Sequence, residues 1–313
     1  MKRRNIGFTV ISIIIVLVIN ISLILYIYTN FRNSDKIYHG FSNEQKVTIL
    51  GYNNDTMEPY ISRDDHYLFF NNYEGPNDKD LYYAERLNST TFQFKGEVEG
   101  VNSLSVDGNP SMDNYSNFYF ISTRDYNPAL GIYSSIYIGK FDDGNVTDLK
   151  KVEGNIDIEE SGWINMGVEI SGDGQTLYFS SAFFEGSNVP IKGNIRFAVK
   201  SGNQFIIPEN EEVILQNINT DHSIEYAGEV SENGLELFYS QVSFLEEGPE
   251  FKLYYSNRST INDPFGVPKL ITEPFEGNKQ AYVEAPSLSQ DGKILYYHKL
   301  DNAKFSIFML SRN

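Results

Sequence analysis

The chain has 313 residues, no cysteine and a formal net charge of −17 at pH 7. The lack of cysteine excludes disulfides and a lipid-modified cysteine anchor. Because nucleic acid and anionic lipid are recognised through clustered Lys and Arg, a domain this acidic is expected to bind no nucleic acid. Cations, basic proteins and neutral sugars remain as possible partners. The alternative is that the charge only keeps an exported domain in solution.

The amino terminus predicts a membrane anchor. A basic stub at residues 1–5 precedes residues 6–28, which contain no charged side chain, and a helix of that length crosses a hydrocarbon core of about 30 Å. The basic stub favours a cytoplasmic amino terminus, so everything after Asn30 is expected on the extracytoplasmic side of the cell membrane. A cleaved signal peptide is the alternative. The apolar run ends in Leu-Tyr-Ile-Tyr rather than in small residues, which favours an uncleaved, single-pass signal anchor.

Residues 29–44 are polar and aperiodic, and we interpret them as a linker before a domain at 45–313. That domain contains five copies of a strand, a tight turn and a second strand. The copies span residues 58–70, 109–120, 167–179, 227–239 and 284–297. Aligned on Ser62, Asp113, Ser171, Ser231 and Ser289, they follow one another at intervals of 51, 58, 60 and 58 residues. A nearly fixed period of this size indicates a repeat architecture.

Each copy predicts the same order of strands. Turns such as Asp173-Gly174 and Asn233-Gly234 between apolar runs are hairpin signals, and an aromatic second strand and a third strand follow. A plainer fourth strand is expected near residues 95–98, 149–152, 212–215 and 269–272.

Counting the strands indicates how the sheet closes. The fifth copy has no fourth strand after it, and Gln45 to Leu50 has the character of the missing one. We therefore predict an all-β, five-bladed β-propeller with four-stranded blades, in which this amino-terminal strand closes the last blade. An open stack of hairpins would leave two exposed edges.

The copies resemble the TolB-type, WD-like β-propeller repeat. Its Pro, Ser, Asp-Gly, aromatic strand and closing strand are matched in the fifth copy by Pro286, Ser289, Asp291, Gly292, Tyr296, Ile307 and Phe308, and in the third by Ser171, Asp173, Gly174 and Tyr178. The second copy departs most, with Asp113 in place of the Ser. The resemblance implies the fold for nearly all of residues 45–313 and leaves the function open, because such propellers serve as scaffolds, binding domains and parts of enzymes.

In a propeller, the loops between second and third strands share one face with the loops that lead into the first strands. Carboxylates recur beside aromatic side chains in those loops, a mixture that suits a sugar or a basic peptide. The candidate binding residues are Glu58, Asn109, Arg124, Tyr126, Trp163, Asn165, Glu225, Tyr226, Tyr282 and Glu284. The alternative is that the acids cap the starts of strands and the rings cover the rims of the sheets.

Catalysis has weaker support. The histidines fall at unrelated places of the repeat, unlike the metal-binding cluster of TolB-like propeller lyases, and are His39, His66, His222 and His298. We therefore assign no metal ligand, no cofactor and no catalytic residue. The Asp residues of the repeat turns are better explained by turn chemistry than by calcium. We predict a non-catalytic binding or scaffold domain for a protein or glycan partner. The alternative is a carbohydrate-active enzyme, a glycoside hydrolase or lyase, using Glu58, Glu225 and Glu284 as its carboxylates.

Overall fold

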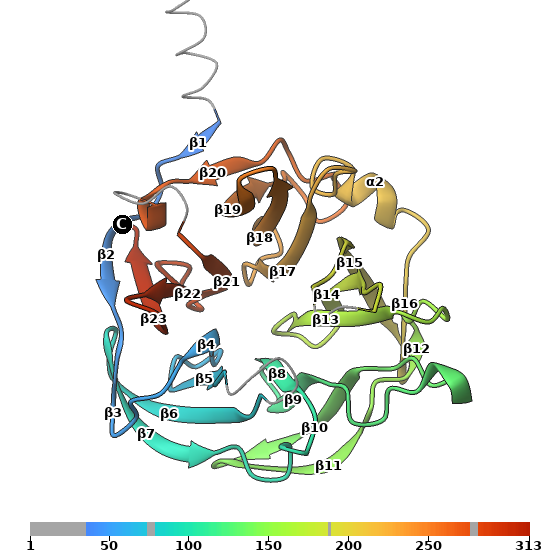
Figure 1. The fold of residues 1–313 in the computed structure, drawn as a ribbon, viewed down its shortest axis with the longest axis horizontal. Helices are drawn as coiled ribbons and strands as arrows, with labels where there is room; N and C mark the ends of the chain where they lie inside the picture. The colour runs from blue at the N-terminus through green and yellow to red at the C-terminus, as the bar shows by residue number, and fades with distance from the viewer. Residues whose placement is uncertain (1–35, 74–78, 187–188, 276–280) are drawn as a thin grey trace, which may run out of the picture.

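The structure, a computed structural model, describes residues 36–73, 79–186, 189–275 and 281–313. Five twisted sheets surround a central axis as the blades of a propeller (Figure 1). Each sheet runs outward from an inner first strand, and consecutive strands pair antiparallel. The predicted all-β, five-bladed architecture is confirmed.

The blades follow one another in sequence order. Blade 1 contains β4 (Met57–Ile61), β5 (Tyr67–Asn71), β6 (Leu81–Asn88) and β7 (Thr91–Glu97), and blade 2 contains β8 (Asp107–Met112), β9 (Asn117–Ser122), β10 (Ile136–Asp142) and β11 (Asn145–Lys151). Blade 3 contains β13 (Trp163–Ile170), β14 (Thr176–Phe183), β15 (Lys192–Ser201) and β16 (Gln204–Ile206), with β12 (Gly154–Asn155) parallel to β16 outside them. Blade 4 contains β17 (Ile224–Val230), β18 (Glu236–Leu245), β19 (Gly248–Asn257) and β20 (Lys269–Ile271), and blade 5 contains β21 (Val283–Leu288), β22 (Ile294–Asp301) and β23 (Lys304–Ser311). Short 3-10 turns lie at η1 (Pro128–Leu130) and η2 (Glu273–Phe275).

The start of the described chain contacts three blades in turn. β1 (Ile37–Tyr38) lies parallel to β20 of blade 4, β2 (Ser42–Lys46) pairs antiparallel with β23, and β3 (Thr48–Leu50) lies parallel to β7 of blade 1. The amino-terminal strand thus closes the last blade, as predicted. Residues 37–44, placed in the linker by the sequence analysis, already belong to the ring.

The closing segment is not the single strand expected from Gln45 to Leu50. Its antiparallel pairing ends at Lys46, and the chain then crosses to blade 1. The side chains of β2 are exposed, whereas Val47 and Ile49 are buried in the cluster shared by blades 5 and 1. Burying these two apolar side chains between the blades accounts for the crossing.

In blade 3 the predicted fourth strand at 212–215 is wrong. Those residues form the helix α2 (Glu211–Leu215), and β16 takes the fourth position. In a strand, Ile214 and Leu215 would point to opposite faces, whereas in the helix both are buried with Ile218 between blades 3 and 4. The carboxylate of Glu211 also accepts two hydrogen bonds from Arg196, at 3.0 and 2.9 Å.

The core lies between neighbouring blades, where the aromatic second strands meet. Between blades 1 and 2, for example, the rings of Phe69 and Phe118 are 5.1 Å apart between centroids, and both are fully buried. The repeat turns are held by their own side chains: Ser171 Oγ lies 2.6 Å from Asp173 Oδ1 and accepts the Thr176 N–H at 2.9 Å. Large rings and self-contained turns therefore give the five copies one backbone plan.

No helix in the described part of the chain is long and apolar enough to cross a bilayer. The predicted span at residues 6–28 lies outside the described residues.

Candidate functional site

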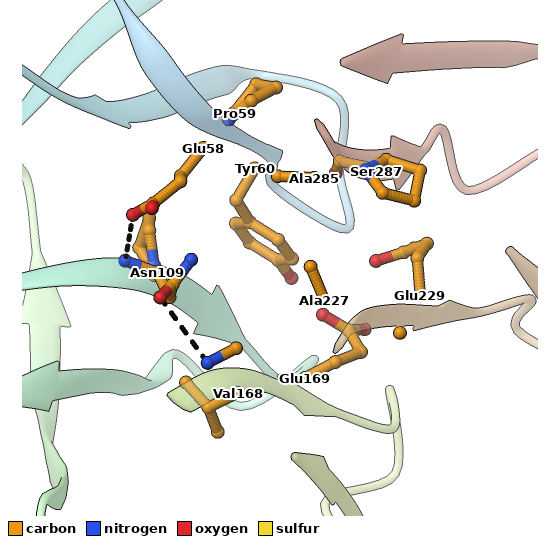
Figure 2. A pocket seen from close by; sticks show the side chains of 14 residues that line it. Glu58, Pro59, Tyr60, Asn109, Val168, Glu169, Ala227, Glu229, Ala285 and Ser287 are labelled. Atoms are coloured by element: carbon orange, nitrogen blue, oxygen red, sulfur yellow. Dashed lines mark hydrogen bonds between the residues drawn. The ribbon is translucent and has the colours of Figure 1, made fainter. Parts of the chain in front are cut away.

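The inner strand of every blade breaks its register at the same place, and these five breaks surround the axis (Figure 2). One residue at each break has a left-handed backbone: Glu58, Asn109, Gly167, Ala227 and Ala285, with φ between 48° and 59°. All five line one central cavity. Bulges of this kind turn backbone and side chains out of the ladder, here toward the axis.

Each bulge N–H finds its acceptor on the preceding blade. Glu58 donates to His298 Nδ1 at 3.1 Å, Asn109 to Glu58 Oε2 at 3.3 Å, Gly167 to Asn109 Oδ1 at 3.4 Å, Ala227 to Ser180 Oγ at 3.2 Å and Ala285 to Ser240 Oγ at 2.9 Å. Figure 2 shows the two contacts that involve Asn109. These bonds link all five blades around the axis.

A second ring lies two residues further along each inner strand. Its members are Tyr60, Ser111, Glu169, Glu229 and Ser287. Ser111 Oγ donates to Glu169 Oε2 at 2.8 Å and accepts the Ile170 N–H at 3.0 Å, again across blades.

Arg63, from the turn of blade 1, reaches across the axis beneath this second ring. It is 7% exposed, donates to the Glu169 carboxylate and donates to the Ile170 carbonyl at 2.6 Å. Burial, together with the neighbouring Glu169, raises the pKa of Glu229 well above its ordinary value. The raised pKa favours the neutral acid at Glu229, while Arg63 pairs with the carboxylates of Glu169 and, at 3.6 Å, Glu232.

The two rings and Arg63 leave little space at the centre. The cavity has a volume of about 30 Å³, which is enough for roughly two water molecules. Sites for small organic ligands are typically about 300–1,000 Å³. The centre of the ring is thus filled by the protein's own side chains.

Polar groups gather at the mouth of this channel on the loop-bearing face. Lys79 Nζ lies 2.7 Å from Glu58 Oε1. Burial favours the neutral acid, but the Lys79 ammonium, together with His298 and the Asn109 N–H, holds the pKa of Glu58 below its ordinary value. Tyr226 donates to the Glu284 carboxylate, whose Oε2 lies 3.4 Å from Nε2 of the fully buried His298. The mouth is a set of paired charges and hydrogen bonds.

The structure brings together five of the ten candidate residues. Glu58, Asn109, Tyr226 and Glu284 meet at the mouth, and the ring of Tyr282 lies close by, 3.8 Å from that of Phe251. His298 lies between the two glutamates: its Nδ1 accepts the backbone N–H of Glu58, and its Nε2 faces the carboxylate of Glu284.

The other five candidates hold loops in place. Glu225 accepts hydrogen bonds from Thr220, Ser223 and Gln241, and Asn165 is hydrogen-bonded to Ile156, Asp157 and Ser181. Arg124 forms an ion pair with Asp107 at 2.7 Å. Tyr126 accepts the Gly162 N–H at 3.0 Å, and the ring of Trp163 packs on that of Phe183. For Glu225 this is the capping role of the acids that the sequence analysis kept as an alternative.

Sequence reasoning missed Arg63, Lys79, Glu169 and Glu229 and discounted His298. Only the two glutamates left a signal, since they lie 60 residues apart at the same position of adjacent repeats. Part of the loop at residues 73–78 lies outside the described residues. In the described ranges, no group of three or more His, Asp or Glu is arranged to hold a metal ion.

Comparison with known proteins supports the fold. No protein-family model matches the chain, and neither does any curated protein sequence. A solved structure described as a glycoside hydrolase is similar with a TM-score of 0.54 at 11% identity, covering 88% of this chain and 92% of that one. The endo-arabinase from Bacteroides thetaiotaomicron gives 0.50 at 14% identity, covering 86% and 98%.

TolB from Acinetobacter baumannii gives a TM-score of 0.46 at 14% identity, covering 83% of this chain and 55% of that one. The chain thus spans about half the length of that protein. At these identities the likenesses are of fold alone, and the class of five-bladed β-propeller rests on the five sheets of this structure.

Proposed function

We propose that this protein is a membrane-anchored, extracytoplasmic propeller that acts as a non-catalytic binding or scaffold domain for a protein or glycan partner. The observation that carries the proposal is the filled channel, with a central cavity of about 30 Å³. The candidate carboxylates at its mouth are engaged by Lys79, Tyr226 and His298. A sugar has no room beside them, so recognition belongs on the rim.

Apolar side chains on the loop-bearing face support this view. Large exposed hydrophobic residues lie on this face at Leu104, Leu130 and Ile191, in loops that lead into first strands or join second to third strands, and at Phe244 and Leu245, where β18 ends. Exposed apolar side chains also occur elsewhere on the chain, and contiguous ones are typical of protein interaction sites. A protein partner with basic groups would cover these side chains and complement the acidic character of the chain as a whole.

A carbohydrate-active enzyme is the second candidate. Glu58 has a lowered pKa and Glu229 a raised one, and both line the same cavity. Carboxyl groups whose pKa values are driven apart are the pattern of a base and an acid. Similar structures include a glycoside hydrolase and an endo-arabinase, which adds a fold-level analogy. The size of the cavity favours the binding domain.

Screening the full chain in detergent against a glycan panel and against co-purifying envelope proteins tests the choice. We expect no glycan cleavage, and a bound partner that Trp163→Ala together with Tyr282→Ala releases. Leu130→Asp is also expected to weaken binding about ten-fold or more, because it places a charge in an apolar contact.

The matched control is Leu87→Asp, an exposed leucine beside the turn to β7 on the opposite face, which should leave binding unchanged. Glycan cleavage that disappears in Glu58→Gln or Glu284→Gln would refute the binding-only proposal. If the partner still binds after the Trp163 and Tyr282 changes but is lost when the Asp173 and Asp291 turns are altered, the binding surface lies on the face of the repeat turns, opposite to the one proposed.

The extracytoplasmic placement has its own test. A broad-specificity protease added to intact cells is expected to degrade the propeller, because the basic stub at residues 1–5 favours a cytoplasmic amino terminus. Immunoblotting against the propeller measures the loss, with a cytoplasmic protein as the control for lysis. Protection until the cells are broken would reverse the orientation.

A further inference from the structure

A groove of about 360 Å³ lies between blades 2 and 3, away from the central channel. Four lysines and two carboxylates line it: Lys140, Lys150, Lys151, Lys200, Asp148 and Glu153. The chain as a whole carries −17, so a local excess of positive charge runs against its general character. The volume falls in the range typical of small-ligand sites.

One wall is the face of blade 2 that is turned toward blade 3. Tyr119, Ile138 and Lys150 are directly paired across β9, β10 and β11, so their side chains form one row on one face. Lys140 is paired with Asn117 two positions further along, on the same face. The strand register therefore places two ammonium groups and one phenol along the same wall.

The facing wall belongs to blade 3. Lys200 and Phe205 are paired across β15 and β16, and Asn203 lies in the turn that joins these strands. The rings of Phe205 and Tyr119 approach edge to face, with centroids 6.4 Å apart. The turn at Asn203 is on the face of the short repeat turns, opposite the loop-bearing face.

Charge in the groove is only partly neutralised within the protein. Lys151 lies 3.3 Å from Asp125, and Lys140 donates to the carbonyl of Tyr115. For Lys150 and Lys200, no carboxylate of the described residues lies within ion-pair distance. These two lysines line the groove from neighbouring blades, and Lys200 Nζ lies 6.0 Å from the centroid of the Phe205 ring.

The hydroxyl of Tyr119 gives an independent indication of a ligand. Tyr119 is 0% exposed, and its buried hydroxyl has no hydrogen-bond partner in the described part of the structure. Burial raises the pKa of Tyr119, so the hydroxyl keeps its proton and remains a donor. Buried donors are nearly always paired, and an unpaired one in the wall of a pocket calls for an acceptor from outside the chain.

We propose that this groove binds a phosphate group, with Lys150 and Lys200 supplying the charge and Tyr119 donating a hydrogen bond. No arginine is among the residues that line it, and lysines bind phosphate as point charges, so the charge they supply is greatest toward a multiply charged anion. The room beside the phosphate accepts a group about the size of a glycerol or a sugar. This site is separate from the loop-bearing face and does not depend on the function proposed above.

Isothermal titration calorimetry of the full chain in non-ionic detergent tests the site, with pyrophosphate and glycerophosphoglycerol as separate probes at low salt. We expect saturable binding that weakens as salt increases. Tyr119→Phe, Lys150→Gln and Lys200→Gln should each lower affinity about ten-fold, the usual effect of losing a hydrogen bond or contact to a charged group. Tighter binding of the phosphodiester would indicate a lipid headgroup or polymer, and tighter binding of pyrophosphate a free metabolite.

Lys269→Gln, an exposed lysine on the outer strand of blade 4, is the matched control and should bind like the unaltered chain. Tyr119→Phe keeps the buried ring, and its thermal unfolding should match that of the unaltered protein, which separates a lost contact from a lost fold. Two results would overturn the proposal: no saturable binding of either probe, or affinity that is the same in Tyr119→Phe and in the lysine variants. In the second case the hydroxyl bonds only to water.

Discussion

Removal of residues 41–52 from the full chain is expected to leave the propeller unfolded at ordinary temperatures. This segment contains β2, which completes blade 5, and three buried apolar side chains, Phe41, Val47 and Ile49. Losing a buried Phe alone costs about 3–5 kcal/mol. Domains are typically stable by only about 5–15 kcal/mol. Circular dichroism during thermal unfolding measures the loss.

A point substitution gives the same test in a milder form. Phe41→Ala should lower the midpoint of thermal unfolding by roughly 10 °C, given the size of the domain. Gln45→Ala, at an exposed position of the same strand, is the control and should change it little. A truncated chain that unfolds like the intact one would show that β2 does not close the ring.

The second large effect is expected at the centre of the ring. Arg63→Met should destabilise the fold by roughly 3–5 kcal/mol, because it leaves the Glu169 charge buried without its partner. Urea unfolding at pH 7 measures the change. Arg86→Met is the control, since its ion pair with Asp65 is partly exposed, at 3.5 Å, and should contribute within about 1 kcal/mol.

The raised pKa of Glu229 adds a dependence of stability on pH. The pKa of Glu229 is raised in the folded state, so the folded protein binds more protons than the unfolded chain above the ordinary value of 4.5. Stability from this group is therefore full below that pH and falls as pH rises toward the folded-state pKa. Glu229→Gln, which mimics the protonated acid, should match the unaltered protein near pH 4 and exceed it at pH 7. If stability depends on pH in the same way in Glu229→Gln and in the unaltered protein, Glu229 does not have a raised pKa. If Arg63→Met is as stable as the unaltered protein, Glu169 carries no buried charge that needs Arg63.

The fold could be predicted because its signals are local and repeat. Turn pairs such as Asp173-Gly174 and aromatic strands recur at nearly constant intervals, and each copy supports the others. The fourth strand of blade 3 was predicted wrongly. The true strand, β16, has only three residues, whereas the more apolar stretch at 212–215 buries its apolar side chains as part of a helix. A short edge strand has little pattern of its own.

The site was predicted less well, for a different reason. Glu58 and Asn109 could be found because a fixed position of the repeat faces the axis. Contacts between distant parts of the chain could not be predicted. Glu58 and His298 are 240 positions apart, and Arg63 and Glu169 are 106 apart. Spacing within a repeat places side chains on a face, but it does not say which of them meet across the ring.

The amino-terminal segment pairs with blades 4, 5 and 1 in turn, and this order determines how the domain would respond to tension. A pulling force applied at residue 36 enters through β1, where Tyr38 stacks on Tyr255 at 3.9 Å and accepts a hydrogen bond from Arg312 at 2.8 Å. This contact must break before load reaches Phe41 and then the ladder between β2 and β23. The contacts of Tyr38 therefore protect the closing strand, so a domain pulled from this end yields at its outer edge before its ring opens.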